Sequence, residues 1–166
     1  KHIKRWALMR NTEEENIQEH SHMVAVLAHA LGVIRRDIFR KPCDVNALAT
    51  AALYHDASEI LTGDLPTPIK YHNAEIMSAY HAVEDLAVQK LLGMLPPELR
   101  ETYADVLAED KDGDIYPLVK AADKLSAYIK CIEERKAGNN EFLSAEAQTR
   151  AALEASPLPE VQYFLE

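Results

Sequence analysis

Glycine is scarce in this chain, with five residues among 166. Alanine, leucine, glutamate and lysine are abundant instead, and these residues have high helix propensity. About half of the residues are apolar, which is enough for a substantial core, and no shift in composition divides the chain. We therefore expect an all-α fold in a single compact domain over residues 1–166.

Basic residues are also under-represented, with 18 lysines and arginines against 27 aspartates and glutamates and a net charge of −9. Proteins that coat DNA or RNA need clustered cations for the phosphate backbone. Polymeric nucleic acid is therefore not an expected partner. A small anion can still bind where a metal or a few placed cations reverse the local sign.

Two features of secreted and membrane proteins are missing as well. Cys43 and Cys131 lie far apart and form no CxxC pair, so both are expected to be free thiols in a reducing compartment. No apolar run approaches the roughly 18 to 20 residues of a membrane span, and no signal-peptide pattern opens the chain. These observations predict a cytoplasmic protein that does not enter a membrane.

Apolar residues recur at helical spacing over most of the chain. The prolines and glycine of Thr62 to Pro68 predict a loop, and the charged residues of Glu109 to Asp114 predict a solvated turn. The predicted helices run from Asn16 to about Arg36, from Val45, capped by Asp44, to about His55, from Asn73 to Leu92, from Pro96 to about Leu107, from Pro117 to near Gly138, and from Ser144 to Ala155.

Four ionisable residues fall where these helices should be buried. They are His20 on the inner face of the first helix, His55 and Asp56 at the end of the second, and Asp123 inside a late one. Each alone is compatible with a satisfied core residue or a cap, but together two imidazoles and two carboxylates are a ligand set for a divalent transition metal. Glu59 follows the pair by three to four residues, close enough to act on water that the metal activates.

The same residues carry a resemblance to a known family. The pattern His20, His55-Asp56, Asp123 is similar to the H…HD…D signature of the HD-domain metal-dependent phosphohydrolases, and five stretches resemble the bacterial 5'-deoxynucleotidases among them. These stretches are RWALMRN (5–11), EHSHMVAVLAHAL (19–31), YHDASEILTGDLPTPIKY (54–71), VKAADKLSAYIKCIEE (119–134) and GNNEF (138–142).

The resemblance implies a helical HD-domain fold and a role for each matching residue. His20, His55, Asp56 and Asp123 would hold one divalent ion, which could be Co²⁺, Mn²⁺, Cu²⁺ or Zn²⁺ because first-row selectivity of such a site is weak. Glu59 would be the catalytic glutamate that orients or deprotonates water. Arg5 would orient the phosphate, for which a planar guanidinium that contacts two oxygens is suited.

Further residues match the family's substrate pocket. Trp6 would lie next to the sugar, and Asp64, Leu65, Pro66 and Thr67 would form the nucleotide-binding loop. A carboxylate at Asp64 together with the indole could reject a 2'-hydroxyl group. Asp56 and Asp123 count among the substrate-binding residues as well as the metal ligands.

The resemblance thus predicts a phosphomonoesterase that converts deoxyribonucleoside 5'-monophosphates to deoxynucleoside and phosphate, and a homodimer. The matching region lacks the family's extreme N-terminus and its C-terminal tail. Two alternatives remain: an HD-domain phosphohydrolase for a triphosphate, a cyclic nucleotide or an alarmone, and a non-catalytic nucleotide-binding helical domain. Intact metal ligands and Glu59 favour catalysis over the second alternative.

Overall fold

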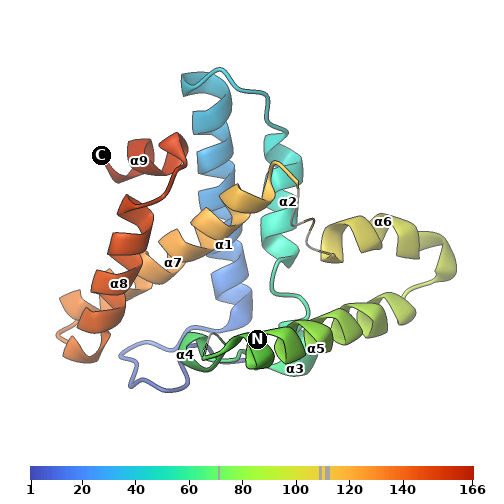
Figure 1. Ribbon diagram of the computed structural model, residues 1–166, viewed down its shortest axis with the longest axis horizontal. Coiled ribbons are helices and arrows are strands. Elements are labelled where there is room, and N and C mark those ends of the chain that lie inside the picture. Colours follow the sequence, from blue (N-terminus) through green and yellow to red (C-terminus); the bar gives the residue numbers. More distant parts are fainter. Residues whose placement is uncertain (71, 109, 111–112) are drawn as a thin grey trace.

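The computed structural model describes residues 1–70, 72–108, 110 and 113–166, and helices dominate these residues (Figure 1). In the described part, extended pairing is limited to one isolated antiparallel bridge between Lys4 and Asn16. The all-α prediction is confirmed. The α-helices are α1 (Ile17–Val33), α2 (Val45–Tyr54), α3 (Glu59–Thr62), α4 (Thr67–Lys70), α5 (Ala74–Gly93), α6 (Pro97–Leu107), α7 (Tyr116–Lys136), α8 (Leu143–Glu154) and α9 (Pro159–Leu165).

Local sequence signals explain where the main helices begin. Asn16 caps α1 in a capping box with Glu19, and the side chain of Asp44 accepts hydrogen bonds from two backbone amides at the start of α2. The side chain of Asn73 accepts a hydrogen bond from the backbone amide of Ile76 at the start of α5. The predicted starts of these helices are therefore close to the observed ones.

The differences from the predicted helices are confined to short segments. The first predicted helix continues beyond α1 as a π-helical turn over Ile34–Ile38, and neither α3 nor α9 is among the predicted helices. The predicted loop from Thr62 to Pro68 is coil only between α3 and α4, because Thr67 already begins α4. Part of the turn expected over Glu109 to Asp114 lies outside the described residues.

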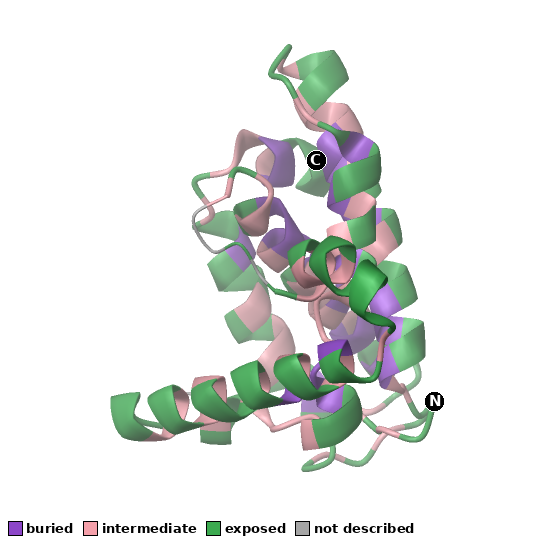
Figure 2. Cartoon of the chain, turned by 90° about the vertical axis from the view of Figure 1, so that its right-hand side faces the viewer, coloured by how far each residue is buried: buried purple, intermediate pink, exposed green. Residues whose placement is uncertain are grey.

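Helices α1, α2 and α7 cross at the centre of the molecule, and α8 and α9 cover α7 and α1 from the other side (Figure 1). Figure 2 shows the buried residues gathered where helices cross, with exposed residues along the outer faces. The apolar side chains of the core are Val24, Leu27, Ala28, Leu31, Leu48, Ala52, Leu118, Val119, Ala121, Ala122, Leu125, Leu153 and Val161.

Helices α5 and α6 extend to one side of this centre (Figure 1). Helix α5 contacts α3, α4 and α6, and its side chains Val83 and Leu86 are exposed. Among the described residues, no helix combines the length and the hydropathy that crossing a membrane requires.

Candidate active site

The predicted metal ligands come from three central helices. His20 lies in the second turn of α1, His55 is the residue at which α2 ends, and Asp123 lies in the first half of α7. Asp56 follows in a turn, where the amide of Glu59 donates to the carbonyl of Asp56 at 3.0 Å. The end of the regular helix lets the adjacent side chains of His55 and Asp56 face one centre, which an uninterrupted helix would spread about 100° apart.

The donor atoms of these four residues converge. Nε2 of His20 lies 3.1 Å from Oδ1 of Asp123 and 3.4 Å from Oδ2 of Asp56. Nε2 of His55 lies 3.2 Å from the same oxygen of Asp56. His20, His55 and Asp123 each offer one ligand atom within 4.8 Å of the others. The structure therefore brings together all four residues that the sequence singled out.

The orientation of both imidazoles fits metal binding. Nδ1 of His55 lies 2.7 Å from the carbonyl oxygen of Ala52, and Nδ1 of His20 lies 3.2 Å from Oγ of Ser126. A carbonyl oxygen only accepts, so Nδ1 of His55 carries a proton, and in the neutral ring that binds a metal the lone pair is at Nε2. Both Nε2 atoms are buried and make no hydrogen bond. Two such nitrogens beside two carboxylates fit a divalent transition ion.

The electrostatics of the cluster keep its carboxylates charged. Burial alone would raise the pKa of Asp123, but the nearby imidazoles of His20 and His55 lower it well below its usual value. The pKa of Asp56 is lowered in the same way, chiefly by His55 against the effect of burial. Burial would lower the pKa of His55, but Asp56 raises it. Ionised oxygens are thus available to a cation.

Glu59 begins α3 beside this cluster and is buried. Its Oε2 atom has no hydrogen-bond partner in the structure. Burial, together with the charges of Asp56 and Asp64, raises the pKa of Glu59 to about 9. A cation among the four predicted ligands would lower this pKa, because opposite charge favours the carboxylate. Glu59 therefore combines an unpaired oxygen with the position of an acid or base.

Arg5 reaches the site from the N-terminal segment, and Trp6 follows it in the chain. Nη1 of Arg5 lies 3.5 Å from Oδ2 of Asp56, and the Arg5 side chain is only 13% exposed. Burial alone would lower the pKa of Arg5, but the surrounding carboxylates, with that of Asp123 foremost, raise it. The indole of Trp6 packs at a tilt against Phe142, with ring centroids 5.2 Å apart. The guanidinium of Arg5 thus lies at the site, and the indole of the next residue, Trp6, is held against Phe142.

The predicted nucleotide loop connects α3 to α4. Gly63 ends α3 with φ 76°, a conformation that favours glycine, and the chain then turns into Asp64. Burial raises the pKa of Asp64, and the charge of Arg5 opposes that rise. Asp64, Leu65 and Pro66 are half-buried, whereas Thr67 is exposed at the start of α4.

Two contributors to the site carried no clear signal in the sequence. Glu15 accepts hydrogen bonds from the side chains of Arg5 and Trp6, but in the run Glu13 to Glu15 it looks like an ordinary surface carboxylate. Ser126 contacts His20, and it lies three residues after Asp123 on the same face of α7. This helical spacing is the one signal that could have identified Ser126.

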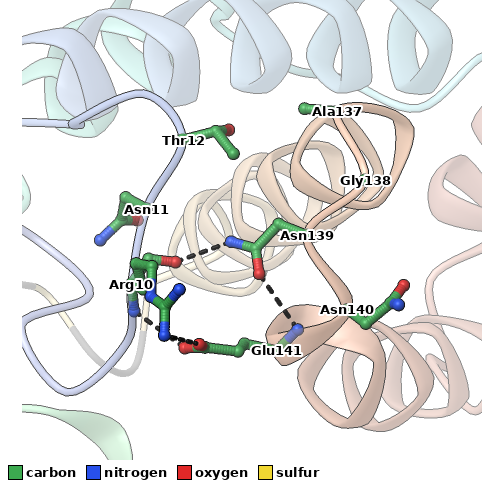
Figure 3. Close-up of a pocket in the computed structure, with 8 residues that line it drawn as sticks. All are labelled: Arg10, Asn11, Thr12, Ala137, Gly138, Asn139, Asn140 and Glu141. Atoms are coloured by element: carbon green, nitrogen blue, oxygen red, sulfur yellow. Dashed lines mark hydrogen bonds and ion pairs between the residues drawn. The ribbon is translucent and has the colours of Figure 1, made fainter.

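The N-terminal segment also borders a cavity of about 360 Å³ that is separate from the predicted site residues (Figure 3). Figure 3 shows the side chains of Asn139 and Glu141 directed across it toward Arg10. The cavity is lined by Arg10, Asn11, Thr12, Ala137, Gly138, Asn139, Asn140 and Glu141.

Comparison with known proteins shows the family. The family model described as 5'-deoxynucleotidase YfbR-like matches residues 1–166. The chain is 51% identical over 165 residues to a 5'-deoxynucleotidase YfbR of Shigella flexneri, covering 99% of this chain and 83% of that protein. It is 50% identical to the protein of that name in Escherichia coli, with the same coverage.

Solved structures agree with this result. An HD-domain phosphohydrolase of Listeria innocua superposes with a TM-score of 0.87 and 27% identity, covering 98% of this chain and 79% of that one. A cyanophage S-2L HD phosphohydrolase bound to dA and one catalytic Zn²⁺ superposes with a TM-score of 0.61 and 27% identity, covering 97% and 84%. The chain is therefore a hydrolase that belongs to the 5'-deoxynucleotidase YfbR-like family of HD-domain phosphohydrolases.

Proposed function

We propose that this protein hydrolyses 2'-deoxyribonucleoside 5'-monophosphates to deoxynucleoside and inorganic phosphate. The observation that carries the proposal is the convergence of two buried imidazole nitrogens and two carboxylates beside Glu59 and Arg5. The name shared by the relatives at 50 to 51% identity gives the substrate class. The deoxyadenosine in the cyanophage relative is a nucleoside of the same kind.

The residues that would hold the ion are His20, His55, Asp56 and Asp123. A divalent ion at this position supplies a Lewis acid that polarises a phosphoryl oxygen and lowers the pKa of water. We infer one ion from the set Co²⁺, Mn²⁺, Cu²⁺ and Zn²⁺, since imidazole and carboxylate ligands suit all four. The single catalytic Zn²⁺ of the cyanophage relative supports one ion and makes Zn²⁺ a natural first choice for testing.

The protein's own groups would then carry the reaction. The guanidinium of Arg5 binds the phosphate and stabilises the charge that develops on its oxygens. Glu59 accepts a proton from the attacking water through its free Oε2 while a new P–O bond forms. The bond from phosphorus to the 5'-oxygen breaks, and that oxygen takes up a proton from the surrounding water as the deoxynucleoside leaves.

Selection of the sugar would fall to Trp6 and to the loop of Asp64, Leu65, Pro66 and Thr67. A ribonucleotide would place a hydroxyl group against the indole and the carboxylate of Asp64, where it would meet steric and desolvation penalties. Asp64 is half-buried, and the charge of Arg5 opposes the rise in its pKa that burial causes; both observations support this assignment.

An activity panel tests the proposal. Purified protein is supplied with each deoxyribonucleoside and ribonucleoside 5'-monophosphate, with nucleoside triphosphates and with a cyclic dinucleotide, each with one of the four metals or with chelator. We expect phosphate release from the deoxy monophosphates in the presence of metal. Preferred hydrolysis of a triphosphate or a cyclic nucleotide would support the second hypothesis from the sequence. If no metal gives phosphate release from any substrate, the remaining hypothesis is a non-catalytic nucleotide-binding domain.

We also propose a homodimer that works as a single-domain protein in the cytoplasm. The outward α5 helix leaves Leu86 70% exposed, and Ile60 of the neighbouring α3 is exposed too, as expected for a surface covered by a second copy. Both cysteines are free thiols, which suits a reducing compartment. Sedimentation should give the mass of a dimer, and Leu86→Glu should reduce it to that of a monomer. The matched change Leu143→Glu, at an exposed leucine of α8, should leave the dimer intact.

A further inference from the structure

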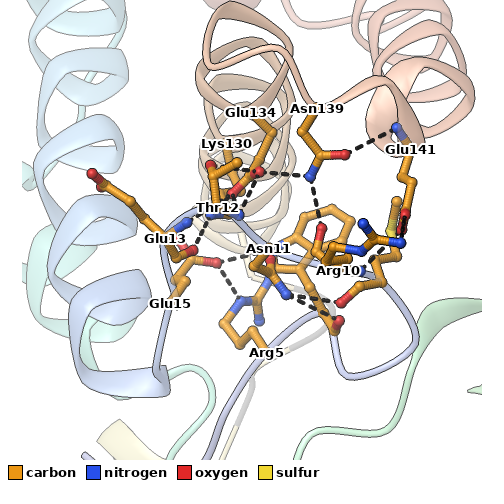
Figure 4. Close-up of polar contacts among 12 residues, drawn as sticks. Arg5, Arg10, Asn11, Thr12, Glu13, Glu15, Lys130, Glu134, Asn139 and Glu141 are labelled. Carbon is orange, nitrogen blue, oxygen red and sulfur yellow. Dashed lines mark hydrogen bonds and ion pairs between the residues drawn. The ribbon is translucent and has the colours of Figure 1, made fainter.

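One carboxylate oxygen connects Arg5, which reaches the site, to its neighbour Trp6. Oε2 of Glu15 accepts a hydrogen bond from Nε of Arg5 and another from Nε1 of Trp6, each at 3.0 Å. The Glu15 side chain is 16% exposed, so both bonds lie in a setting where water competes poorly. Figure 4 shows Glu15 directed at Arg5 from the opposite side of the segment.

The backbone supports the same pairing. The amide of Arg5 donates to the carbonyl of Glu15 at 3.0 Å, and the isolated bridge between Lys4 and Asn16 lies next to it. Trp6 has φ 59°, a left-handed conformation that is costly for a bulky side chain. The bond to Glu15 and the packing against Phe142 are two of the contacts that offset this cost.

The hydrogen bond from Nε of Arg5 to Glu15 also determines which edge of the guanidinium is available to bind a ligand. Nε is engaged by Glu15, and the terminal nitrogen Nη1 lies at the cluster, 3.5 Å from Oδ2 of Asp56. We propose that Glu15 is a positioning residue that holds the phosphate-binding guanidinium of Arg5 and the indole of Trp6 in one fixed relation. This inference rests on the proposed function for the ligand of Arg5.

The segment as a whole has a separate anchor, so Glu15 is not needed to attach it. The carboxylate of Glu134 accepts hydrogen bonds from the amide and hydroxyl of Thr12 at 2.9 and 2.8 Å, and from Nδ2 of Asn139 at 2.8 Å. Lys130 pairs with Glu134 and donates to the carbonyl of Glu13 at 2.6 Å (Figure 4). Removing the Glu15 carboxylate should therefore release two side chains without detaching the segment.

Kinetics of three variants test the role. Glu15→Ala is expected to lower kcat/KM for a deoxynucleoside monophosphate by about 10- to 100-fold, the usual cost of losing a group that orients site residues. Glu15→Gln keeps an acceptor oxygen and should fall between Glu15→Ala and wild type. The matched control is Glu14→Ala, which removes an exposed carboxylate paired with exposed Lys4 and should retain wild-type kinetics.

The split between kinetic constants separates positioning from a general loss of folded protein. Misplacement of Trp6 should raise KM, and misplacement of Arg5 should lower kcat, so both constants should change while circular dichroism shows an intact fold. The preference for deoxy over ribo substrates should fall in the same variant. If Glu15→Ala is folded and matches Glu14→Ala in both constants and in sugar preference, the proposal is overturned.

Trp6 is the only tryptophan in the chain, so its fluorescence reports the indole without any substrate. Acrylamide should quench this emission more strongly in Glu15→Ala than in wild type or Glu14→Ala.

If wild type hydrolyses no nucleotide but quenching rises as expected, the proposed function fails and the positioning of Trp6 stands. If wild type is active and Glu15→Ala shows unchanged quenching, the positioning role is overturned. If Glu15→Ala does not fold, Glu15→Gln provides the test. Wild-type kinetics together with wild-type quenching in this variant would overturn the positioning role.

Discussion

The side chains of this site are oriented by contacts on their far sides. His55 turns Nε2 inward because its Nδ1–H is held by the carbonyl of Ala52, and His20 is restrained by Ser126. Arg5 is restrained in the same manner by Glu15. A metal or phosphate ligand therefore meets groups that have already lost most of their rotational freedom, which lowers the entropic cost of binding.

Glu59→Gln tests the base at the scale of one residue. Glutamine keeps the size of the side chain but cannot accept the proton, so kcat should fall by about 10²- to 10⁴-fold with little change in KM. Steady-state kinetics measure the loss, and elemental analysis should show that the bound metal remains. A glutamine variant with wild-type kcat would remove Glu59 from the mechanism.

At the scale of elements, the end of α3 determines where the predicted nucleotide loop begins. Gly63 has φ 76° and ψ 162°, a region that only glycine adopts readily, although no atom blocks a Cβ there. Gly63→Ala should therefore destabilise the fold by about 1 to 3 kcal/mol and raise KM through displacement of Asp64.

Thermal unfolding and kinetics check this expectation, with Gly93→Ala as the control. Gly93 lies in the last turn of α5, where a Cβ meets no atom within 4 Å and φ is not left-handed. The control should leave stability unchanged or increase it by up to about 1 kcal/mol, because alanine favours helices. Equal effects from the two substitutions would contradict a conformational role for Gly63.

The contact between the N-terminal segment and α7 depends on one buried carboxylate. Burial would raise the pKa of Glu134, but Lys130 and the amide of Thr12 lower it to about 2. The unfolded chain binds this proton at higher pH than the folded chain does. The charged Glu134 therefore stabilises the fold above the ordinary pKa of a glutamate, and that stabilisation is lost as the pH falls toward about 2.

Glu134→Gln should lower the free energy of unfolding by about 3 to 5 kcal/mol near neutral pH, as for a broken buried ion pair. The difference from wild type should shrink below the ordinary pKa of glutamate, as urea unfolding at several pH values would show. Glu154→Gln alters an exposed pair with Arg150 and should cost less than about 1 kcal/mol. A difference that stays constant down to pH 2 would argue against the charged pair.

At the scale of the whole molecule, the predicted ligands join α1, the end of α2 and α7, which are distant in the sequence. A bound ion would therefore stabilise the folded state alone. Metal at 100 times its dissociation constant should add about 2.7 kcal/mol to the free energy of unfolding. Chelation should lower the Tm of wild type and added metal should restore it, whereas the Tm of His55→Ala should not respond. A metal response in His55→Ala equal to that of wild type would place the ion elsewhere.

The sequence alone determined the long helices and the candidate ligands. Helical spacing and caps such as Asp44 are local, and the HD pair at a helix end was visible as a group of polar residues with no apolar partner. The family resemblance supplied the substrate class, which the relatives then supported.

Only the tertiary structure decided what holds these groups in place. Glu15 pairs with Arg5 and Trp6, and Thr12 with Glu134 across 122 positions of the chain. Helical periodicity reports only which residues share a face, whereas these bonds depend on how separate elements pack. A carboxylate in a run of three glutamates acquires its partners only after folding brings the two sides of the N-terminal segment together.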